Sequence, residues 1–304
     1  MIDSEPIRGL WCATLTPLGP SGAIDHASMV AHVRALFAEG VDGVAPFGTT
    51  GEGPSFSVAE RQAGLDALIA AGIAPSRLIP GTGCAAFSDT VTLTRHALQV
   101  GCARCLVLPP FFFKDLGDDA VYGYFAALID AVDDPRLSLY LYHIPQFSGV
   151  AISADVVARL AADFPRTIAG VKDSGGDFAH TETLLAAAPG LAILVGHEPH
   201  LPKLMRAGGA GTICGIANLF PRLVAPLLEP NVTQLDQERI AAFIEAVFRF
   251  PFLPAFKAVR AAQTNDATWR TLRPPLFALN ENDRVRLFAA LAAAGFSNGT
   301  EIER

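Results

Sequence analysis

The sequence predicts an α/β fold of the (β/α)8 class, a TIM barrel followed by a C-terminal helical domain. Two features of the 304 residues predict it. Eight short apolar runs alternate with longer alanine-rich stretches of helical periodicity. The alternation stops near Pro221, after which helical patterns and prolines continue without a convincing strand. We therefore expect a catalytic barrel over residues 1–224 and a helical domain over residues 225–304.

The strands are expected where the apolar runs fall. In chain order these are residues 10–16, 43–47, 78–81, 105–108, 137–142, 167–172, 192–195 and 211–215. Several are apolar on both faces, as strands of a parallel sheet covered by helices should be. Periodicity predicts helices over residues 26–40, 58–71, 89–101, 119–133 and 154–163. Eight such units fit a barrel better than a doubly wound open sheet, because no GxGxxG fingerprint follows the first strand.

Composition and charge limit the classes of protein to which this chain can belong. Hydrophobic residues make up 51% of the chain and charged residues 17%, which suits a large core and excludes a disordered chain. A net charge of −7 argues against a nucleic-acid-binding surface. No apolar run reaches the roughly 18 residues of a membrane-spanning helix, and the polar, acidic start is unlike a signal peptide. Five cysteines, an odd number, favour a reducing compartment, so we expect a cytoplasmic protein.

Lys172 is the first candidate for chemistry, because active sites of TIM barrels lie at the carboxyl ends of the strands. The chain has four lysines and nineteen arginines, and Lys172 is the only lysine inside a predicted strand. Alternation places Gly170, Lys172 and Ser174 on one face, and we expect Gly170 to leave space beneath the amine. A desolvated amine can attack a carbonyl and form a Schiff base. The alternative is a lysine that extends along the strand end into solvent.

Tyr142 and a glycine-bounded turn complete the candidate set. Tyr142 ends the fifth predicted strand, where a phenol can move protons on and off oxygen or can simply pack. The turn at residues 48–53 reads GTTGEG. Its backbone N–H groups and the hydroxyls of Thr49 and Thr50 suit a carboxylate, although Thr in an ordinary strand-to-helix turn can also cap the helix.

Three segments together carry a resemblance to a known family. GTTGEG at 48–53, YHIP at 142–145 and IAGVKDSGG at 168–176 resemble the signature segments of the dihydrodipicolinate synthase / N-acetylneuraminate lyase family. The resemblance extends over nearly the whole chain, through residues 80–83, 107–113, 211–221, 273–276 and 280–287. It implies a Schiff-base (class I) lyase that uses no metal and no cofactor.

The resemblance also implies roles for individual residues. Lys172 would form an imine with pyruvate or another 2-oxo acid, Tyr142 would be the acid/base, and Thr49 and Thr50 would hold the carboxylate, with Thr49 in hydroxyl contact with Tyr142. Further substrate contacts would come from Gly48, Gly196 and Ile213. The partners implied are a 2-oxo acid (pyruvate) and an aldehyde, and the assembly implied is a homotetramer or a homodimer.

Two residues depart from the family pattern. Phe112 stands where dihydrodipicolinate synthases carry a tyrosine that the neighbouring subunit's proton relay borrows, and Phe147 stands where they carry an arginine that grips the aldehyde's carboxylate. Loss of such a clamp strongly weakens the binding of an anionic substrate. We therefore expect an aldolase or dehydratase of a 2-keto-3-deoxy acid, or of a less polar aldehyde, with phenylalanines in the distal pocket. Genuine dihydrodipicolinate synthase activity is the alternative.

Two other classes of protein remain as competing hypotheses. A metal-dependent aldolase could use side chains near the strand ends, namely His143, Asp173, His197 and Glu198, although alternation turns His143 away from the face of Tyr142. A non-catalytic paralogue could bind a 2-oxo acid without turning it over. Cys102 and Cys105 lack a second pair of ligands for zinc, so we expect two buried thiols.

Overall fold

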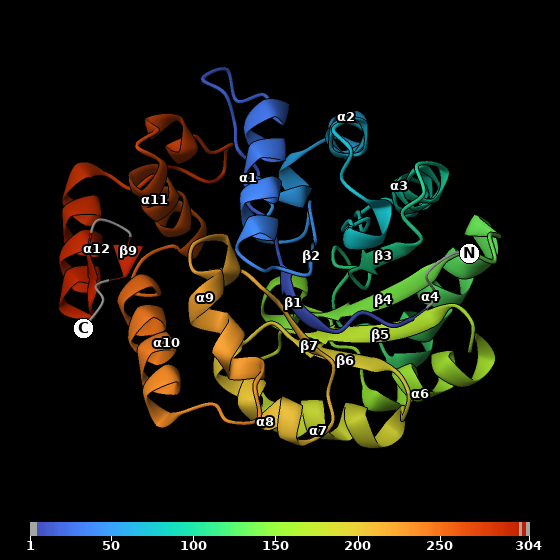
Figure 1. The fold of residues 1–304 in the computed structure, drawn as a ribbon. Coiled ribbons are helices and arrows are strands. Elements are labelled where there is room, and N and C mark those ends of the chain that lie inside the picture. The colour runs from blue at the N-terminus through green and yellow to red at the C-terminus, as the bar shows by residue number, and fades with distance from the viewer. Residues whose placement is uncertain (1–4, 298–299, 302–304) are drawn as a thin grey trace.

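The computed structural model describes residues 5–297 and 300–301, and its main feature is a curled, seven-stranded parallel sheet (Figure 1). The strands are β1 (Gly9–Cys12), β2 (Gly43–Val44), β3 (Arg104–Val107), β4 (Ser138–His143), β5 (Ile168–Asp173), β6 (Ala192–Val195) and β7 (Gly211–Cys214). Neighbouring strands follow the order β2-β1-β7-β6-β5-β4-β3, so β2 and β3 form the two edges.

The remaining predicted strand, residues 78–81, lies between those two edges. Leu78 forms a parallel bridge with Val44 of β2, and Gly81 forms one with Leu106 of β3. The segment stays this short because Pro80 has no N–H to donate to a ladder. Backbone pairing thus continues round the sheet, as in the predicted TIM barrel.

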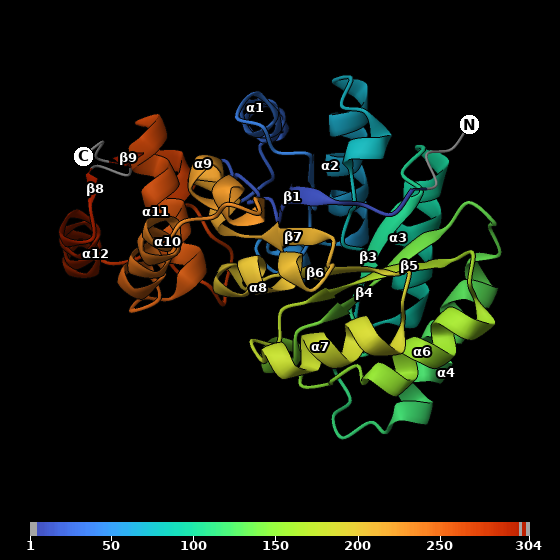
Figure 2. The same ribbon diagram turned by 60° about the horizontal axis from the view of Figure 1, so that its bottom comes forward.

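Helices lie outside the sheet and alternate with its strands (Figure 2). They are α1 (His26–Ala38), α2 (Val58–Ala70), α3 (Phe87–Gln99), α4 (Asp118–Val132), α6 (Ala154–Asp163), α7 (Phe178–Ala187) and α8 (Leu201–Arg206), with the short α5 (Pro145–Ser148) after β4. The five predicted helices are confirmed, with ends shifted by two residues at most. Local side chains set several starts: Asp25, Ser57 and Ser153 each accept a hydrogen bond from a backbone N–H in the first turn of the helix that follows.

The core has two parts, one between strands and helices and one inside the barrel. Trp11, Tyr140 and Leu194 are among the side chains that fill the interior. Gly170 was expected to leave space beneath the Lys172 amine, and that expectation is wrong. A Cβ at position 170 would lie 2.8 Å from the ring of Tyr140 and 2.3 Å from the carbonyl oxygen of Ala192. The glycine therefore makes room for Tyr140, whose hydroxyl accepts a hydrogen bond from the Ile7 N–H at 2.8 Å.

After Pro221 the chain is mainly helical, as predicted, but it also forms a short strand pair that the sequence did not predict. The elements are α9 (Pro221–Val224), α10 (Gln234–Val247), α11 (Phe252–Thr264), α12 (Glu281–Ala293) and a small antiparallel pair, β8 (Phe296–Ser297) with β9 (Thr300–Glu301). Arg273 ties this region to the barrel through a two-pronged contact with Glu60 at 2.5 and 3.1 Å. The boundary at residue 224 stays a prediction.

Two further features concern the chain as a whole. Within the described ranges, no helix is both long and apolar enough to cross a membrane. All five cysteines are free thiols, and Cys102 and Cys105 are both buried, as predicted.

Candidate active site

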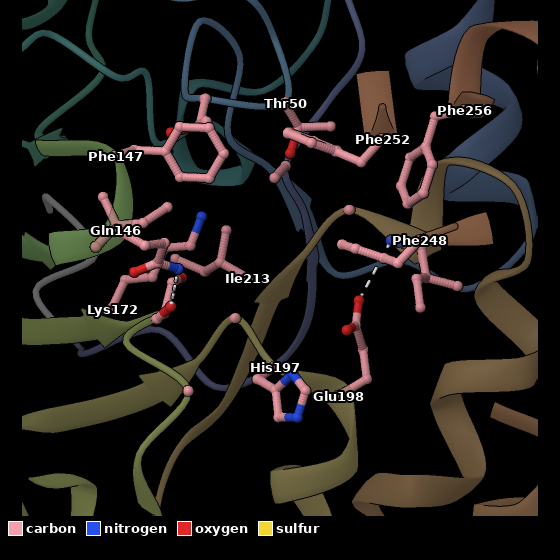
Figure 3. A pocket seen from close by; sticks show the side chains of 18 of the residues that line it. Thr50, Gln146, Phe147, Lys172, His197, Glu198, Ile213, Phe248, Phe252 and Phe256 are labelled. Carbon is pink, nitrogen blue, oxygen red and sulfur yellow. Dashed lines mark hydrogen bonds between the residues drawn. The ribbon is translucent and has the colours of Figure 1, made fainter. Parts of the chain in front are cut away.

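A cavity of about 560 Å³ opens at the carboxyl ends of the strands (Figure 3). Strand ends supply most of its polar groups, and the C-terminal helices supply an apolar wall. Its lining is Ala13, Thr49, Thr50, Tyr142, Ile144, Gln146, Phe147, Lys172, Ser174, Gly176, Gly196, His197, Glu198, Ile213, Gly215, Ile216, Ile244, Phe248, Phe250, Phe252 and Phe256.

Lys172 and Tyr142 meet in this cavity. They are register partners on the parallel strands β5 and β4, and both point into the barrel. The Lys172 Nζ lies 4.1 Å from the centre of the Tyr142 ring, and Lys172 is only 3% exposed. Position 196 must remain small beside them, because a Cβ there would lie 2.0 Å from Ser174 Oγ and 3.4 Å from Lys172 Cε. An amine and a phenol thus share one cavity, and Gly196 leaves room beside them.

Thr49 brings a hydroxyl to the same place. Its Oγ1 lies 3.2 Å from the Tyr142 hydroxyl, within hydrogen-bond distance. The turn that carries it is tight, because Phe47 and Glu52 both adopt left-handed backbone conformations, with φ of 61° and 56°. The left-handed backbone of Phe47 also excludes this residue from an extended strand, and β2 ends at Val44, short of the predicted Phe47.

The remaining predicted binding residues divide into two groups. Thr50, Gly196, Ile213 and Phe147 all line the cavity, whereas Gly48 is not among the lining residues. Phe112 also lies elsewhere: it is 71% exposed and packs edge-on against Phe113, with 5.4 Å between ring centres. Of the two predicted phenylalanines, Phe147 lines the cavity of this chain.

A buried ion pair anchors the threonine turn to the C-terminal helices. Glu52, two residues after Thr50, contacts the amine of Lys257 on α11, and both side chains are fully buried. Burial raises the pKa of the Glu52 carboxyl and lowers that of Lys257, while their mutual attraction opposes both shifts. Lys257 also donates to the carbonyl oxygen of Thr271 at 2.9 Å. Sequence reasoning missed this pair, because its members are 205 residues apart in the chain.

Glu198 is a buried carboxyl in the cavity wall. It follows β6 and is 5% exposed, and its Oε1 accepts a hydrogen bond from the Ile216 N–H at 3.3 Å (Figure 3). Burial raises the pKa of this carboxyl, which favours its protonated form. His197 lines the cavity beside it, and burial lowers the pKa of that imidazole. Burial thus opposes the charged form of both residues.

His143, Asp173 and His180 form the cluster of His and acidic side chains that could hold a metal ion among the residues described. His197 and Glu198, which the metal hypothesis grouped with His143 and Asp173, lie in the cavity instead. His143 faces away from Tyr142, as alternation predicted, and its ring stacks on His180 with 4.1 Å between centres. The sequence-based set of four metal ligands is therefore not assembled.

Both ring nitrogens of His180, Nδ1 of His143 and both carboxylate oxygens of Asp173 already have hydrogen-bond partners. His180 Nδ1 lies 3.0 Å from Asp173 Oδ2, and its Nε2 lies 3.0 Å from the Ile152 carbonyl oxygen. Both of these partners are acceptors, and the hydrogen bond to Asp173 raises the pKa of the His180 imidazole, which favours its protonated form. His143 Nδ1 accepts from the Ile152 N–H at 3.0 Å. The donor set suits a hydrogen-bonded ion pair behind Lys172 better than a metal, which needs free lone pairs on nitrogen.

The C-terminal helices add four phenylalanines that sequence reasoning did not assign to the site. Phe248 follows α10, Phe250 lies in the connection, and Phe252 and Phe256 belong to α11. The spacing FRFPFLPAF at 248–256 was the available signal, because four phenylalanines in nine residues exceed what one helix face needs for packing. In Figure 3 Phe252 and Phe256 lie on one side of the cavity, and Lys172 and His197 lie on the other.

Comparison with known proteins supports the resemblance seen in the sequence. The profile of the dihydrodipicolinate synthetase family matches residues 6–294. A DapA-like lyase of Chloroflexus aurantiacus is 36% identical, over 94% of this chain and 96% of the relative. The crystal structure of a dihydrodipicolinate synthase from Agrobacterium tumefaciens superimposes with a TM-score of 0.89 at 37% identity, over 94% of this chain and 99% of that one. A 2-keto-3-deoxygluconate aldolase variant from Sulfolobus solfataricus, 21% identical over 94% and 95% of the two chains, shares the fold with a TM-score of 0.84.

Proposed function

This chain belongs to the dihydrodipicolinate synthetase family, and from that premise we propose that it is a class I lyase that works through a Schiff base on Lys172. One observation carries the proposal. The Lys172 amine lies 4.1 Å from the Tyr142 ring, and the Tyr142 hydroxyl lies 3.2 Å from Thr49 Oγ1, all within one cavity. This arrangement supplies a nucleophile and a proton carrier together.

In the condensing direction the reaction begins at Lys172. The nitrogen lone pair of its amine attacks carbon 2 of pyruvate, the carbonyl oxygen leaves as water, and an iminium ion forms. Carbon 3 then loses a proton to give an enamine. Carbon 3 bonds to the carbonyl carbon of an aldehyde, and the aldehyde oxygen gains a proton. Water hydrolyses the new iminium ion and releases a 4-hydroxy-2-oxo acid and the free amine; cleavage is the reverse sequence.

The other residues of the cavity serve this sequence. Tyr142 carries protons to and from the oxygens that leave or form, and Thr49 orients its hydroxyl. Thr50 and the backbone N–H groups of its turn hold the carboxylate of the 2-oxo acid, next to the main chain at Gly196 and Ile213. If the 4-hydroxyl leaves as water with a proton from carbon 3, the same enamine chemistry gives a dehydratase.

The distal lining favours an aldolase or dehydratase of a 2-keto-3-deoxy acid over a dihydrodipicolinate synthase. Phe147 stands where an arginine clamp is expected, and no arginine occurs among the cavity-lining residues of the described chain. A second carboxylate would meet phenyl rings there, which a charged group does not tolerate without a partner. A relative from Rhizobium meliloti, 31% identical over 96% of this chain and 99% of its own, is nevertheless a 4-hydroxy-tetrahydrodipicolinate synthase, which keeps that activity as the alternative.

The setting of the enzyme is also part of the proposal. We infer a cytoplasmic homotetramer or homodimer, in which the barrel of residues 1–224 carries the reaction and the helical region of residues 225–304 closes the cavity. Support for the last point is that Ile244, Phe248 and Phe256 belong to the lining.

Trapping the imine tests the proposal. The protein is incubated with pyruvate and borohydride, and its intact mass is measured. We expect the mass to rise by one reduced pyruvate adduct and the rise to vanish in Lys172→Ala. A wild-type protein that gains no adduct, yet still binds pyruvate by calorimetry, would be the non-catalytic 2-oxo-acid-binding paralogue instead.

A further inference from the structure

The far end of the cavity is built for an apolar ring. Phe252 stands at the centre of an aromatic group: its ring centre lies 5.9 Å from that of Phe147, 6.2 Å from that of Phe248 and 6.0 Å from that of Phe256. The rings of Phe248 and Phe252 are parallel within 4°, and the other two meet Phe252 nearly edge-on. We call these four residues the aromatic wall.

Packing of the helices does not account for the whole wall. Phe256 is buried and belongs to the core, so it has a structural role. Phe147 and Phe248 are 58% and 56% exposed, although they line a concave site. Large apolar side chains left in contact with water at a cavity mark a surface that a ligand covers.

Charge and hydrogen-bonding groups come from the barrel end of the cavity, where Thr50 meets the aromatic wall: a Cβ at Gly215 would lie 3.4 Å from Thr50 Oγ1 and 3.0 Å from Phe256 Cε2. Its polar side chains come from strand ends and from the segments directly after them, which include the short helix α5; they are Thr49, Thr50, Tyr142, Gln146, Lys172, Ser174, His197 and Glu198. Gln146 already donates to the Ser174 carbonyl oxygen at 2.6 Å. Lys172 is the only lysine of the lining as described. This end matches the carboxylate, the keto carbon and the reacting hydroxyl of the substrate.

We propose that the aldehyde partner of this enzyme is aromatic, and that the aromatic wall holds its ring. The inference rests on the proposed function and names its substrate class. A hydroxylated sugar tail placed against the wall would leave its hydroxyls without hydrogen-bond partners, whereas a flat ring would gain stacked and edge-on contacts.

The reaction balances for such a substrate. Carbon 3 of the pyruvate enamine bonds to the aldehyde carbon, carbon 3 has already given up one proton, and the aldehyde oxygen takes one up. The product is a 4-aryl-4-hydroxy-2-oxobutanoate. It is still a 2-keto-3-deoxy acid, because carbon 3 carries two hydrogens and no hydroxyl.

Three aldehydes of different chemistry test the inference: benzaldehyde, glyceraldehyde and succinate semialdehyde, each offered with pyruvate. Consumption of pyruvate is followed, and kcat/KM is determined for each aldehyde. We expect benzaldehyde to exceed the other two by roughly tenfold or more, in line with the discrimination that apolar pockets achieve. A higher value for glyceraldehyde or succinate semialdehyde overturns the inference.

Matched variants locate the effect. Phe147→Ser and Phe248→Ser change exposed side chains, so both proteins should fold, and thermal melting checks this. Each should lower kcat/KM for benzaldehyde about tenfold and leave the pyruvate adduct intact. Phe277→Ser is the control, because Phe277 is 72% exposed and lies outside the cavity lining. Wild-type selectivity in both wall variants overturns the inference.

The borohydride adduct distinguishes failure of the further inference from failure of the proposed function. If the adduct forms and benzaldehyde is not preferred, the inference fails and the proposed function stands. If no adduct forms with pyruvate, the proposed function fails and the inference falls with it.

Discussion

The carboxyl of Glu52 and the amine of Lys257 contact each other out of reach of water, and this contact joins the turn of Thr49 and Thr50 to helix α11. The same helix carries Phe252 and Phe256 of the aromatic wall. One buried ion pair therefore ties the threonine turn to the helix that carries two members of the aromatic wall.

Removal of one member of this pair should be costly. Glu52→Gln leaves the Lys257 ammonium buried without a counter-charge, and we expect a loss of about 3–5 kcal/mol in the free energy of unfolding. Denaturant titration measures it. The double variant Glu52→Gln, Lys257→Met removes the charge as well and should recover most of the loss. A single variant as stable as the wild type would show that the pair does not anchor the turn.

Tyr142→Phe tests the proton carrier. The variant keeps the ring beside Lys172 and removes the hydroxyl that faces Thr49. We expect kcat to fall on the order of a hundredfold, as loss of a general acid/base does, while pyruvate affinity changes little. Steady-state kinetics and calorimetry measure the two quantities. Wild-type turnover in the variant would rule out this role for Tyr142.

Phe147→Arg tests the missing clamp. The substitution returns a guanidinium to the place where the family pattern has one, and Phe147 is exposed enough to accept it. We expect the ratio of kcat/KM for succinate semialdehyde to that for benzaldehyde to rise at least tenfold, because a bidentate contact favours a carboxylate. An unchanged ratio would mean that position 147 does not touch the aldehyde.

The pKa shifts of His143 and His180 determine part of the dependence of folding stability on pH. Burial lowers the pKa of His143 to about 4, from an ordinary value of about 6.5. The unfolded chain therefore binds more protons than the folded one between these values, so stability falls as the pH drops from 6.5 to 4. We expect a loss of about 2–3 kcal/mol from this group. His143→Asn keeps an acceptor for the Ile152 N–H but has no titrating imidazole at this position. Melts at pH 7 and pH 5 should therefore show a smaller difference in stability for this variant than for the wild type.

His180 has the opposite effect on folding stability, at higher pH. Its hydrogen bond to Asp173 raises the pKa of the imidazole, so its contribution to stability is complete below its ordinary pKa. The contribution is lost as the pH rises through the raised value. Burial alone would raise the pKa of Asp173, but hydrogen bonds from His180, the Gly175 N–H and Thr181 lower it, so this carboxylate stays ionised until the pH is well into the acid range.

Much of the site's position could be predicted from sequence periodicity. Tyr142 and Lys172 end neighbouring strands, and alternation puts both on the inner face, so their proximity follows from strand order alone. Thr49 follows in the same way from its place after β2. The helices of the barrel were predictable because apolar spacing and cap residues act over a few neighbours in the chain.

The rest depends on contacts between distant segments. Alternation identified the face of Gly170, but not that Tyr140 on the adjacent strand would fill the space above it. The docking of α10 and α11 decides which phenylalanines reach the cavity, and no local pattern encodes that docking. Gly48 was assigned by resemblance and is not among the lining residues, whereas Phe112, whose place in the family pattern serves the neighbouring subunit, stays a prediction.

The most direct test of the account is to locate the trapped pyruvate along the chain. Four lysines compete for it, and Lys257 is as deeply buried as Lys172 but outside the cavity lining. After borohydride reduction and proteolysis, peptide mass mapping should find the adduct on Lys172 alone. An adduct on Lys257, Lys114 or Lys203, or none on any peptide, would contradict the account.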